Sequence, residues 1–584
     1  MTPREFLMIV LVVSGCASVD AAAFNPADFE AAISPEIQRT RRAERNIGLS
    51  VGVVSATGSK WLKSFGERDR KSHAPMSNST AYQVGDFSKV LTTLALLKLV
   101  GDKRVDLDAK VSDYLPEFAP RSRFERNPAI RVRDLLTHHS GLSAGRWQGL
   151  FYKQRSTTSG ALDLGDLSLS QQTGQIYAYS NTGFEVLGAL IYRVSGQPIA
   201  EFVELNVLRP LDMQQSGYSA PTDAARGHRK GERLPALAAR DTAALGAWMS
   251  ANDMLKLLGV LLDPKAFESK LGIPASLLRD MLTVQNRDVV LDIDNRTGLT
   301  WQLTNTGRHR VARVARMDIG FPGFRGAALL APDEGVAAIV VANSGGSGEA
   351  LGELARRVFD ELLLAERGLK PPDYSAIVPD TVAWPASAKP AEMAPFYATA
   401  LGLVSFAKAS DGHFIMDFLG YDIHATERPD GWYQLRYRLL GLMPLSLGIF
   451  NKVLVAPARI DGEEVLLAYF QGGRFLFGQT LKPAKSMPEV QKLLGRYKLK
   501  NGDALTDQLK IESVELIERD GLLLANYTIT AGLLDFDAAI PLLPSEPGSW
   551  VVPGLGTNMG DTLRVTPRGA GYTLEFSGYR FERD

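Results

Sequence analysis

The stretch from Val84 to Val100 constrains the fold more than any other part of the chain. Its apolar residues stand at positions 87, 90, 91, 94, 97, 99 and 100. This spacing predicts a mostly buried helix that begins just after Gly85, with Asp86 at the capping position. Asp86 and Lys89 are three residues apart, so both are expected on one face at the positive end of the helix. This charged pair is the first candidate site.

Length and charge limit what kind of protein this is. With 584 residues the chain is too long for one hydrophobic core, so two or three domains are expected. Hydrophobic residues make up 45% and charged residues 22%, which is typical of a globular protein. Lys plus Arg and Asp plus Glu both number 65. Because the net charge is zero, nucleic acid is not expected as a partner.

Residues 1–16 have the composition of a secretory signal: a basic residue and a short apolar run precede small residues and Cys16. Residues 13–16 resemble a bacterial lipobox, which predicts lipidation of Cys16; a plain signal with a chance cysteine is the alternative. Cys16 is the only cysteine, so no disulfide framework is possible. Ala17 resembles the sorting residue of outer-membrane lipoproteins. We therefore expect a lipid-anchored protein on the periplasmic side of the bacterial envelope, with a tether over residues 17–30.

Several further segments resemble one known family. They are two strands over residues 48–54 and 61–66, the segments 105–118 and 130–142, and Tyr179-Ser180-Asn181 followed by Thr-Gly and an apolar helix. Together they resemble the serine β-lactamase and penicillin-binding protein superfamily, especially the class C-like branch of β-lactamases, esterases and D-aminopeptidases. The resemblance implies an α/β (α+β) domain over residues 31–370, in which helices flank an antiparallel sheet.

In that family the central helix opens with Ser-x-x-Lys, where the serine is the acylated nucleophile and the lysine assists its deprotonation. Here the motif aligns on Lys89, and Asp86 occupies the position of the nucleophile. The second motif is complete. The resemblance implies that Tyr179 exchanges a proton with nucleophile and leaving group, and that Asn181 holds the lysine and the substrate amide.

The third family motif, Lys-Thr-Gly or His-x-Gly, falls at residues 317–319. The run from Gly320 to Gly335 sets this register, and it places Met317 and Ile319 where the family has a cationic or imidazole group and a glycine. Gly320, Phe321 and Arg316 are the expected substrate-binding residues, and Arg313 is the alternative cation for a carboxylate.

The histidines and one further motif are interpreted as structural. His138 and His139 are adjacent, so their side chains point in different directions, and the family uses this segment for packing. The other five histidines have no ligand spacing, so we predict no metal and no cofactor. The literal Ser-x-x-Lys of Ser405 and Lys408 lies among strand signals and is interpreted as chance.

After a proline-rich linker at 368–373 the sequence changes to short alternating segments separated by Asp-Gly and Gly-Gly turns. This pattern predicts two antiparallel β units, 375–486 and 487–584. Their arrangement resembles the lipocalin-like barrels of some superfamily hydrolases. The apolar run 439–455 is interpreted as barrel interior or domain interface, with a membrane-contacting or acyl-binding loop as the alternative.

The identity of residue 86 decides the functional hypothesis. A carboxylate that attacked an amide would give a mixed anhydride, uphill of the starting amide, and its charge would raise the pKa of Lys89. Ser88 is one helical step away and is not expected to substitute. We therefore favour a pseudoenzyme that binds a peptidoglycan fragment, a peptide, a small acyl or amide ligand, or a partner protein. The alternative is an active hydrolase with Asp86 as general base and Lys89 and Tyr179 polarising the substrate.

Overall fold

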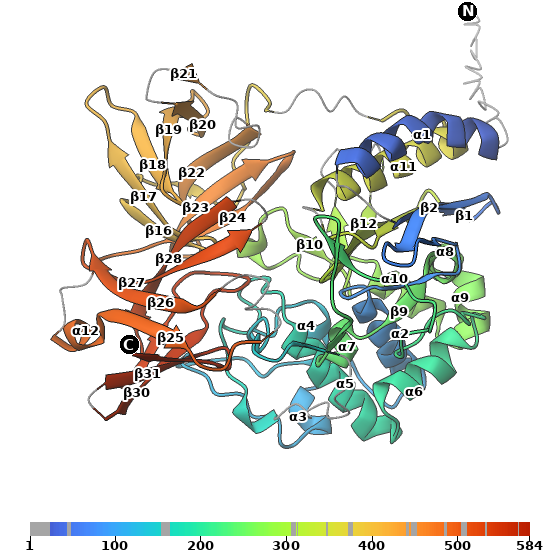
Figure 1. Cartoon of the computed structure of the whole chain (residues 1–584), viewed down its shortest axis with the longest axis horizontal. Helices are drawn as coiled ribbons and strands as arrows, with labels where there is room; N and C mark the ends of the chain where they lie inside the picture. Colours follow the sequence, from blue (N-terminus) through green and yellow to red (C-terminus); the bar gives the residue numbers. More distant parts are fainter. Residues whose placement is uncertain are drawn as a thin grey trace, which may run out of the picture.

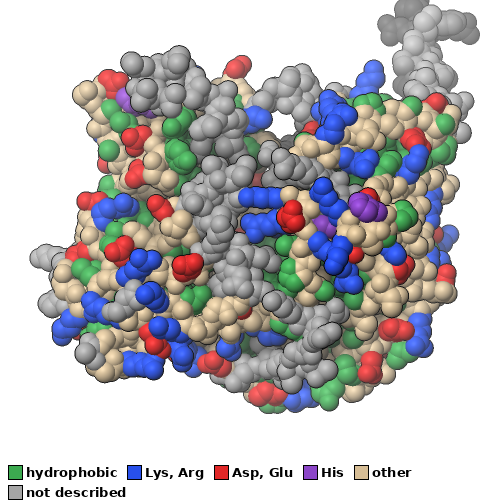
Figure 2. All heavy atoms as spheres, in the orientation of Figure 1, with side chains coloured by type: hydrophobic (Ala, Val, Ile, Leu, Met, Phe, Trp, Pro, Cys, Tyr) green, Lys and Arg blue, Asp and Glu red, His purple; other side chains and the backbone are tan. Residues whose placement is uncertain are grey.

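The chain folds into an N-terminal α/β unit followed by two β-barrels (Figure 1). The computed structural model describes residues 24–43, 48–153, 164–304, 311, 313–345, 348–371, 378–439, 443–444, 452–483, 488–503, 511–531, 534–569 and 571–583. The predicted antiparallel sheet with flanking helices is confirmed, as are the all-β units after it. Figure 2 shows Lys and Arg side chains interspersed with Asp and Glu on both halves of the face drawn.

An eight-stranded antiparallel sheet forms the centre of the N-terminal unit. Its strands are, in order, β10 (Arg296–Thr297), β11 (Gln302–Thr304), β12 (Val314–Phe321), β13 (Phe324–Ala331), β14 (Val336–Ala342), β1 (Gly48–Ser55), β2 (Lys60–Asp69) and β3 (Ala74–Pro75). Strands β1 and β14 are buried along almost their whole length because helices cover both faces. This explains why β14 is continuously apolar and why β1 has only small or apolar residues.

Two helices cover one face of the sheet. They are α1 (Pro26–Ala43) and α11 (Glu349–Arg367), which lie together in Figure 1. Phe29, Ile33 and Ile37 of α1 are buried in the core that α11 shares with the sheet. The predicted tether over residues 17–30 therefore overlaps a packed helix from Pro26 onward. Cys16 lies outside the described residues, and no helix within them is long and apolar enough to cross a membrane.

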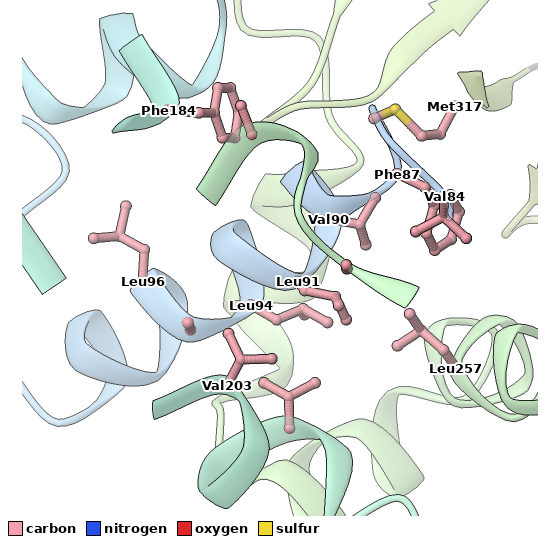
Figure 3. Close-up of a cluster of buried hydrophobic side chains, with 14 of the residues drawn as sticks. Val84, Phe87, Val90, Leu91, Leu94, Leu96, Phe184, Val203, Leu257 and Met317 are labelled. Carbon is pink, nitrogen blue, oxygen red and sulfur yellow. The ribbon is translucent and has the colours of Figure 1, made fainter. Parts of the chain in front are cut away.

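The larger core lies on the other face of the sheet, around α2 (Ser88–Gly101). In Figure 3 α2 runs through the cluster and contributes Val90, Leu91 and Leu94, with Phe87 just before it. The predicted buried helix is therefore present, but the prediction that Asp86 caps it was wrong. The helix begins at Ser88, the capping residue is Phe87, and no side chain caps it. Asp86 instead lies in a turn in which the Ser88 amide donates to the Gly85 carbonyl over 2.8 Å.

The remaining helices and small sheets pack around α2 or connect the main elements. They are α3 (Val111–Tyr114), α4 (Val132–Leu136), η1 (Leu164–Asp166), α5 (Asn181–Ser195), α6 (Ile199–Val203), η2 (Glu204–Leu208), α7 (Thr242–Leu245), α8 (Ala251–Leu261), α9 (Pro264–Leu271), α10 (Ala275–Met281), η3 (Val290–Asp292), and the strand pairs β4 (Ala81–Gln83) with β9 (Trp248–Ser250), β5 (Phe151–Lys153) with β8 (Leu237–Ala239), and β6 (His228–Arg229) with β7 (Glu232–Arg233).

The first barrel is a ring of eight antiparallel strands. They are, in order, β22 (Val453–Ile460), β23 (Glu463–Phe470), β24 (Gly473–Thr480), β16 (Phe396–Thr399), β17 (Gly402–Lys408), β18 (Phe414–Phe418), β19 (Tyr421–Glu427) and β20 (Tyr433–Leu439). The ring closes because β20 pairs with β22. Short strands β15 (Lys389–Pro390) and β21 (Met443–Pro444) flank it. Much of the apolar run 439–455 lies outside the described residues, so its two interpretations stay open.

The second barrel is also closed and follows α12 (Pro488–Leu493). Its strands are β25 (Gly495–Leu499), β26 (Ser513–Arg519), β27 (Leu522–Ala531), β28 (Leu534–Pro544), β29 (Ser549–Val551), β30 (Thr562–Arg568), β31 (Gly571–Phe576) and β32 (Tyr579–Arg583). Ile176 and Leu291 of the N-terminal unit share one hydrophobic core with Trp432 of the first barrel and Leu555 of the second. The three units therefore meet in one packed junction.

Candidate active site

Four residues singled out in the sequence meet in one hydrogen-bonded group. The Lys89 ammonium lies 2.9 Å from Asp86 Oδ1 and 2.7 Å from the Tyr179 hydroxyl. That hydroxyl donates a short hydrogen bond to Asp86 Oδ1 and lies 2.8 Å from Asn181 Oδ1. Lys89 is 1% exposed, whereas the Asp86 side chain is 27% exposed. Asp86 is therefore the charged member of the group that a ligand can reach.

Local structure explains why Tyr179 and Asn181 face Lys89. Ser180 caps α5, and its hydroxyl accepts a hydrogen bond from the Gly183 amide over 2.9 Å. This cap fixes Tyr179 just before the helix and Asn181 at its first position. The His138 ring packs against the Tyr179 ring, and the two ring centroids are 4.9 Å apart. A Ser-capped helix start therefore presents both motif side chains to α2.

Burial dominates the electrostatics of this group. Loss of water lowers the pKa of Lys89, and the neighbouring Asp86 carboxylate opposes that change only in part. The expectation that pairing with Asp86 would give Lys89 a raised pKa was therefore wrong, because burial has the larger effect. Burial also raises the pKa of Tyr179 well above its usual value, and the Asp86 charge adds to this. Tyr179 is therefore held as a neutral phenol that can donate to the carboxylate.

Two groups behind Lys89 were not identified from the sequence. The Ala244 carbonyl lies 3.4 Å from the Lys89 ammonium, and the Ala244 amide donates to Glu185 Oε1 over 3.0 Å. Loss of water and the nearby Asp241 charge raise the pKa of Glu185 to about 8. A backbone carbonyl has no signature in a sequence, and Glu185 lies within an apolar helix pattern that gives no hint of its partner.

Strand β12 closes the other side of the site. A parallel bridge joins Gly85 to Gly320, and a Cβ on Gly320 would lie 2.6 Å from Asp86 Oδ2. Gly320 is thus next to Asp86, as predicted. Met317 and Ile319, at the positions of the third family motif, are 8% and 1% exposed and belong to the core around α2. Figure 3 shows Met317 beside Phe87.

The other two predicted substrate-binding residues are placed differently from the prediction. Phe321 is 2% exposed and packs edge-on against Phe151, so it is part of the core. Arg316 pairs with Asp318 on its own strand over 2.7 Å and lies near Gly352 of α11. Arg316 thus points toward α11, whereas its neighbour Met317 points into the core around α2. The cation beside Gly320 is instead Arg325, whose Nη1 would lie 3.0 Å from a Cβ at Gly320.

Both adjacent histidines are engaged inside the unit. The Ser180 amide donates to His138 Nδ1 over 3.0 Å, and His139 Nε2 lies 2.8 Å from Asp292 Oδ2. Both rings are buried. Within the described ranges, no group of three or more His, Cys, Asp or Glu side chains could hold a metal ion. Ser405 and Lys408 both lie on strand β17 of the first barrel.

Comparison with known proteins gives a family match over the N-terminal unit. The family described as Beta-lactamase matches residues 34–363, which is more than half of the chain. The chain is 32% identical over 221 residues to Esterase EstB of Burkholderia gladioli, covering 35% of this chain and 55% of that protein. It is 28% identical over 224 residues to the putative penicillin-binding protein PbpX of Bacillus subtilis (strain 168), covering 36% of this chain and 53% of that one.

A third relative carries a different name. The chain is 31% identical over 156 residues to the N-acetylmuramyl-L-alanine amidase of Bacillus subtilis (strain 168), covering 25% of this chain and 35% of that protein. The matched region spans about half the length of the first two relatives. The similarity thus establishes a shared domain and not a shared activity.

Proposed function

The chain belongs to the beta-lactamase family, and from this premise we propose that it is a member that binds its ligand without becoming acylated. Its fold and second motif are those of a serine hydrolase-like protein, and its nucleophile position holds Asp86. The proposed role is a pseudoenzyme of the bacterial envelope. Its site recognises a ligand through the groups that remain, and no ester to the protein forms.

One observation carries this proposal: both groups that would activate a nucleophile are bound to Asp86 Oδ1. Lys89 Nζ lies 2.9 Å from that oxygen, and the Tyr179 hydroxyl donates to it. In a serine-dependent member such groups take up the hydroxyl proton. A carboxylate has no proton to give at neutral pH, and its attack on an amide would produce a mixed anhydride. The acylation step is therefore absent by chemistry, although its supporting groups stay in place.

The strand opposite Asp86 supports the same proposal. The family places a lysine or histidine on this strand, and here the aligned position holds Met317, which is 8% exposed in the core. The aligned glycine has become Ile319, which is 1% exposed. Neither side chain offers a charged or hydrogen-bonding group to a ligand at Asp86. Two of the three motifs thus lack the groups that the family uses for acylation.

The proposed ligand is a peptide or acyl-amide fragment of peptidoglycan. The site offers a partly exposed carboxylate on Asp86, the Tyr179 hydroxyl and the Asn181 amide, which together suit the N–H and C=O groups of a peptide. The names of two relatives, a putative penicillin-binding protein and an N-acetylmuramyl-L-alanine amidase, point to the same class of ligand. A protein partner that presents such a peptide has the same chemistry.

A second candidate function rests on the 27% exposure of the Asp86 side chain. A carboxylate that water can reach could act as a general base on a water molecule, with Lys89 and Tyr179 polarising a substrate carbonyl. The same hydrogen bonds count against it, since Asp86 Oδ1 already receives two donors. This hydrolase is therefore the runner-up.

The test compares the native protein with Asp86→Asn. Each is incubated with a fluorescent penicillin, with a panel of esters and D-amino-acid amides, and with a synthetic stem peptide whose binding is measured by calorimetry. We expect no covalent label, no turnover, and saturable peptide binding that Tyr179→Phe weakens. A labelled native chain would overturn the proposal. Turnover that Asp86→Asn abolishes would establish the hydrolase instead.

Attachment to the envelope through Cys16 is part of the same proposal. The residues before Cys16 resemble a lipobox, and helix α1 begins only ten positions further on, at Pro26. We expect metabolically supplied palmitate to label the native chain and the outer-membrane fraction to contain it. Cys16→Ser should lose the label and release the protein from membranes. Label retained in Cys16→Ser would contradict lipidation at this residue.

A further inference from the structure

The connection between β29 and β30, residues 552–561, reaches from the second barrel to the N-terminal unit. Three side chains of that unit bind it. Arg123 Nη1 donates to the Gly560 carbonyl over 2.8 Å, Gln171 Nε2 donates to the Met559 carbonyl over 2.9 Å, and the Ser170 hydroxyl donates to Asp561. The place of this segment is therefore set by contacts with the N-terminal unit as well as by the barrel.

Close packing leaves this segment little freedom. Val552 and Met559 are 6% and 3% exposed. Gly560 has a φ of +82°, and a Cβ there would lie 1.8 Å from the Ser170 carbonyl oxygen. Glycine is needed at this point, because any side chain would collide with the backbone of the N-terminal unit. The connection is thus a docked element rather than a loose loop.

The docked segment holds the backbone of the motif tyrosine. The Tyr179 amide donates to the Thr557 hydroxyl over 3.0 Å. The neighbouring amides of Ala178, Ser180 and Asn181 donate to groups inside the N-terminal unit, namely the His138 carbonyl, His138 Nδ1 and the Ala144 carbonyl. Of these four consecutive amides, only that of Tyr179 is satisfied by another unit.

We infer that residues 552–561 of the second barrel form part of the functional site, with Thr557 as a positioning residue for Tyr179. Thr557 acts on the main chain of Tyr179, whose hydroxyl contacts both Asp86 and Lys89. Removing the hydroxyl of Thr557 leaves the partly buried Tyr179 amide without its partner, which costs free energy. The phenol then loses its fixed place beside Asp86. This role goes beyond the proposed function and does not depend on whether a ligand is turned over.

The test places 3-fluorotyrosine at position 179 and records its ¹⁹F resonance in the full chain. Thr557→Val keeps the shape of the side chain and removes the acceptor, so we expect the resonance to shift and broaden. Thr557→Ser keeps the acceptor and should restore the parent signal. Thr566→Val is the matched control, because Thr566 is exposed on β30 of the same barrel. Thermal melts establish that every variant is folded.

Two outcomes would overturn the inference. One is a resonance in Thr557→Val that is the same as in the parent. The other is a Thr557→Ser variant that matches Thr557→Val, which would indicate a packing effect and no role for the hydroxyl. A second readout uses Asp86→Ser and a fluorescent penicillin, where we expect Thr557→Val to slow acylation at saturation roughly fivefold or more, with little change in half-saturation. Absence of any label in Asp86→Ser would mean that the lost strand motif limits acylation by itself, and the ¹⁹F result would then decide the role of Thr557.

Discussion

The carboxylate of Asp86 changes what its neighbours do. In a serine-dependent member the lysine and tyrosine accept and return the nucleophile's proton. Here Lys89 and Tyr179 both donate to Asp86 Oδ1. Residues 86, 89 and 179, which transfer a proton in a serine-dependent member, here form an ion pair with one added hydrogen bond. One side chain is responsible for this difference.

Restoring the hydroxyl should therefore restore part of the reaction. In Asp86→Ser we expect slow covalent labelling by a fluorescent penicillin, roughly tenfold or more above the native chain, because Lys89, Tyr179 and Asn181 are already in place. Labelling should stay far below that of a complete enzyme, because Met317 and Ile319 replace the third motif. Gel fluorescence and mass spectrometry measure it, with Asp86→Asn as the unlabelled control. No label in Asp86→Ser would mean that the lost strand motif is limiting by itself.

Glu185 gives a prediction about stability and pH. Its folded-state pKa is raised to about 8, from an ordinary value near 4.5. Protonated Glu185 stabilises the fold below pH 4.5, and this contribution is lost as the pH rises through about 8. We expect Glu185→Gln to gain stability over the native chain between those pH values, by roughly 1–3 kcal/mol at pH 8. Thermal melts of both proteins at several pH values measure the difference, and parallel curves would refute it.

The turn before α2 and strand β12 are in close contact at Gly85 and Gly320. Gly85 has a φ of +49°, and a Cβ there would lie 1.9 Å from the Gly320 carbonyl oxygen. Gly320 in turn leaves room for Asp86 Oδ2. The spacing between these two elements is therefore matched to the aspartate as well as to the backbone.

This match predicts a coupled pair of substitutions. Gly320→Ala should destabilise the native chain by about 1–3 kcal/mol, because its Cβ would lie 2.6 Å from Asp86 Oδ2. The cost should fall by half or more in an Asp86→Ser background, since serine lacks the carboxylate oxygen. Urea unfolding of both single variants and the double variant measures the coupling. Additive effects on the free energy of unfolding would show that the new methyl group meets a neighbour other than Asp86.

At the scale of the whole molecule, the three units share buried contacts near the site. Ile176 packs in one core with Trp432 of the first barrel, and Tyr179 follows it by three residues. The second barrel also binds Arg123, Ser170 and Gln171 through residues 552–561. The segment that carries the second motif therefore contacts both barrels.

Disrupting the docked segment, residues 552–561, should weaken the contact between the second barrel and the N-terminal unit. Gly560→Ala places a Cβ 1.8 Å from the Ser170 carbonyl oxygen at a φ of +82°, and we expect a loss of roughly 2 kcal/mol or more. Limited proteolysis should then cut between the N-terminal unit and the second barrel before either is degraded. Gly569→Ala is a suitable control, since Gly569 also has a positive φ (+59°) but has no neighbour within 4 Å of an added Cβ. Equal proteolysis of the two variants would refute the prediction.

The sequence predicted what has a local signature and missed what depends on contacts between distant segments. The pattern of apolar residues predicted the buried helix and the hairpin of β1 and β2. The family motifs predicted that Lys89 and Tyr179 lie close together. The start of α2 was misplaced because Phe87 and not Asp86 caps it. The pairing of Arg316 with Asp318 was not predicted, and Thr557 was missed because only tertiary packing brings it to Tyr179. Each barrel likewise depends on pairing between strands far apart in the chain, β16 with β24 in the first and β25 with β32 in the second.

Closure of the two barrels affects how readily copies of the protein associate through their strands. A strand with unpaired amides and carbonyls invites strands from other molecules, and a closed ring has none to offer. In the large open sheet the described outer strands are β10 and β3, each only two residues long, and the second ends in Pro75. Proline donates no hydrogen bond to an added strand. The described strands of this sheet and of the two barrels thus present little template for edge-to-edge self-association.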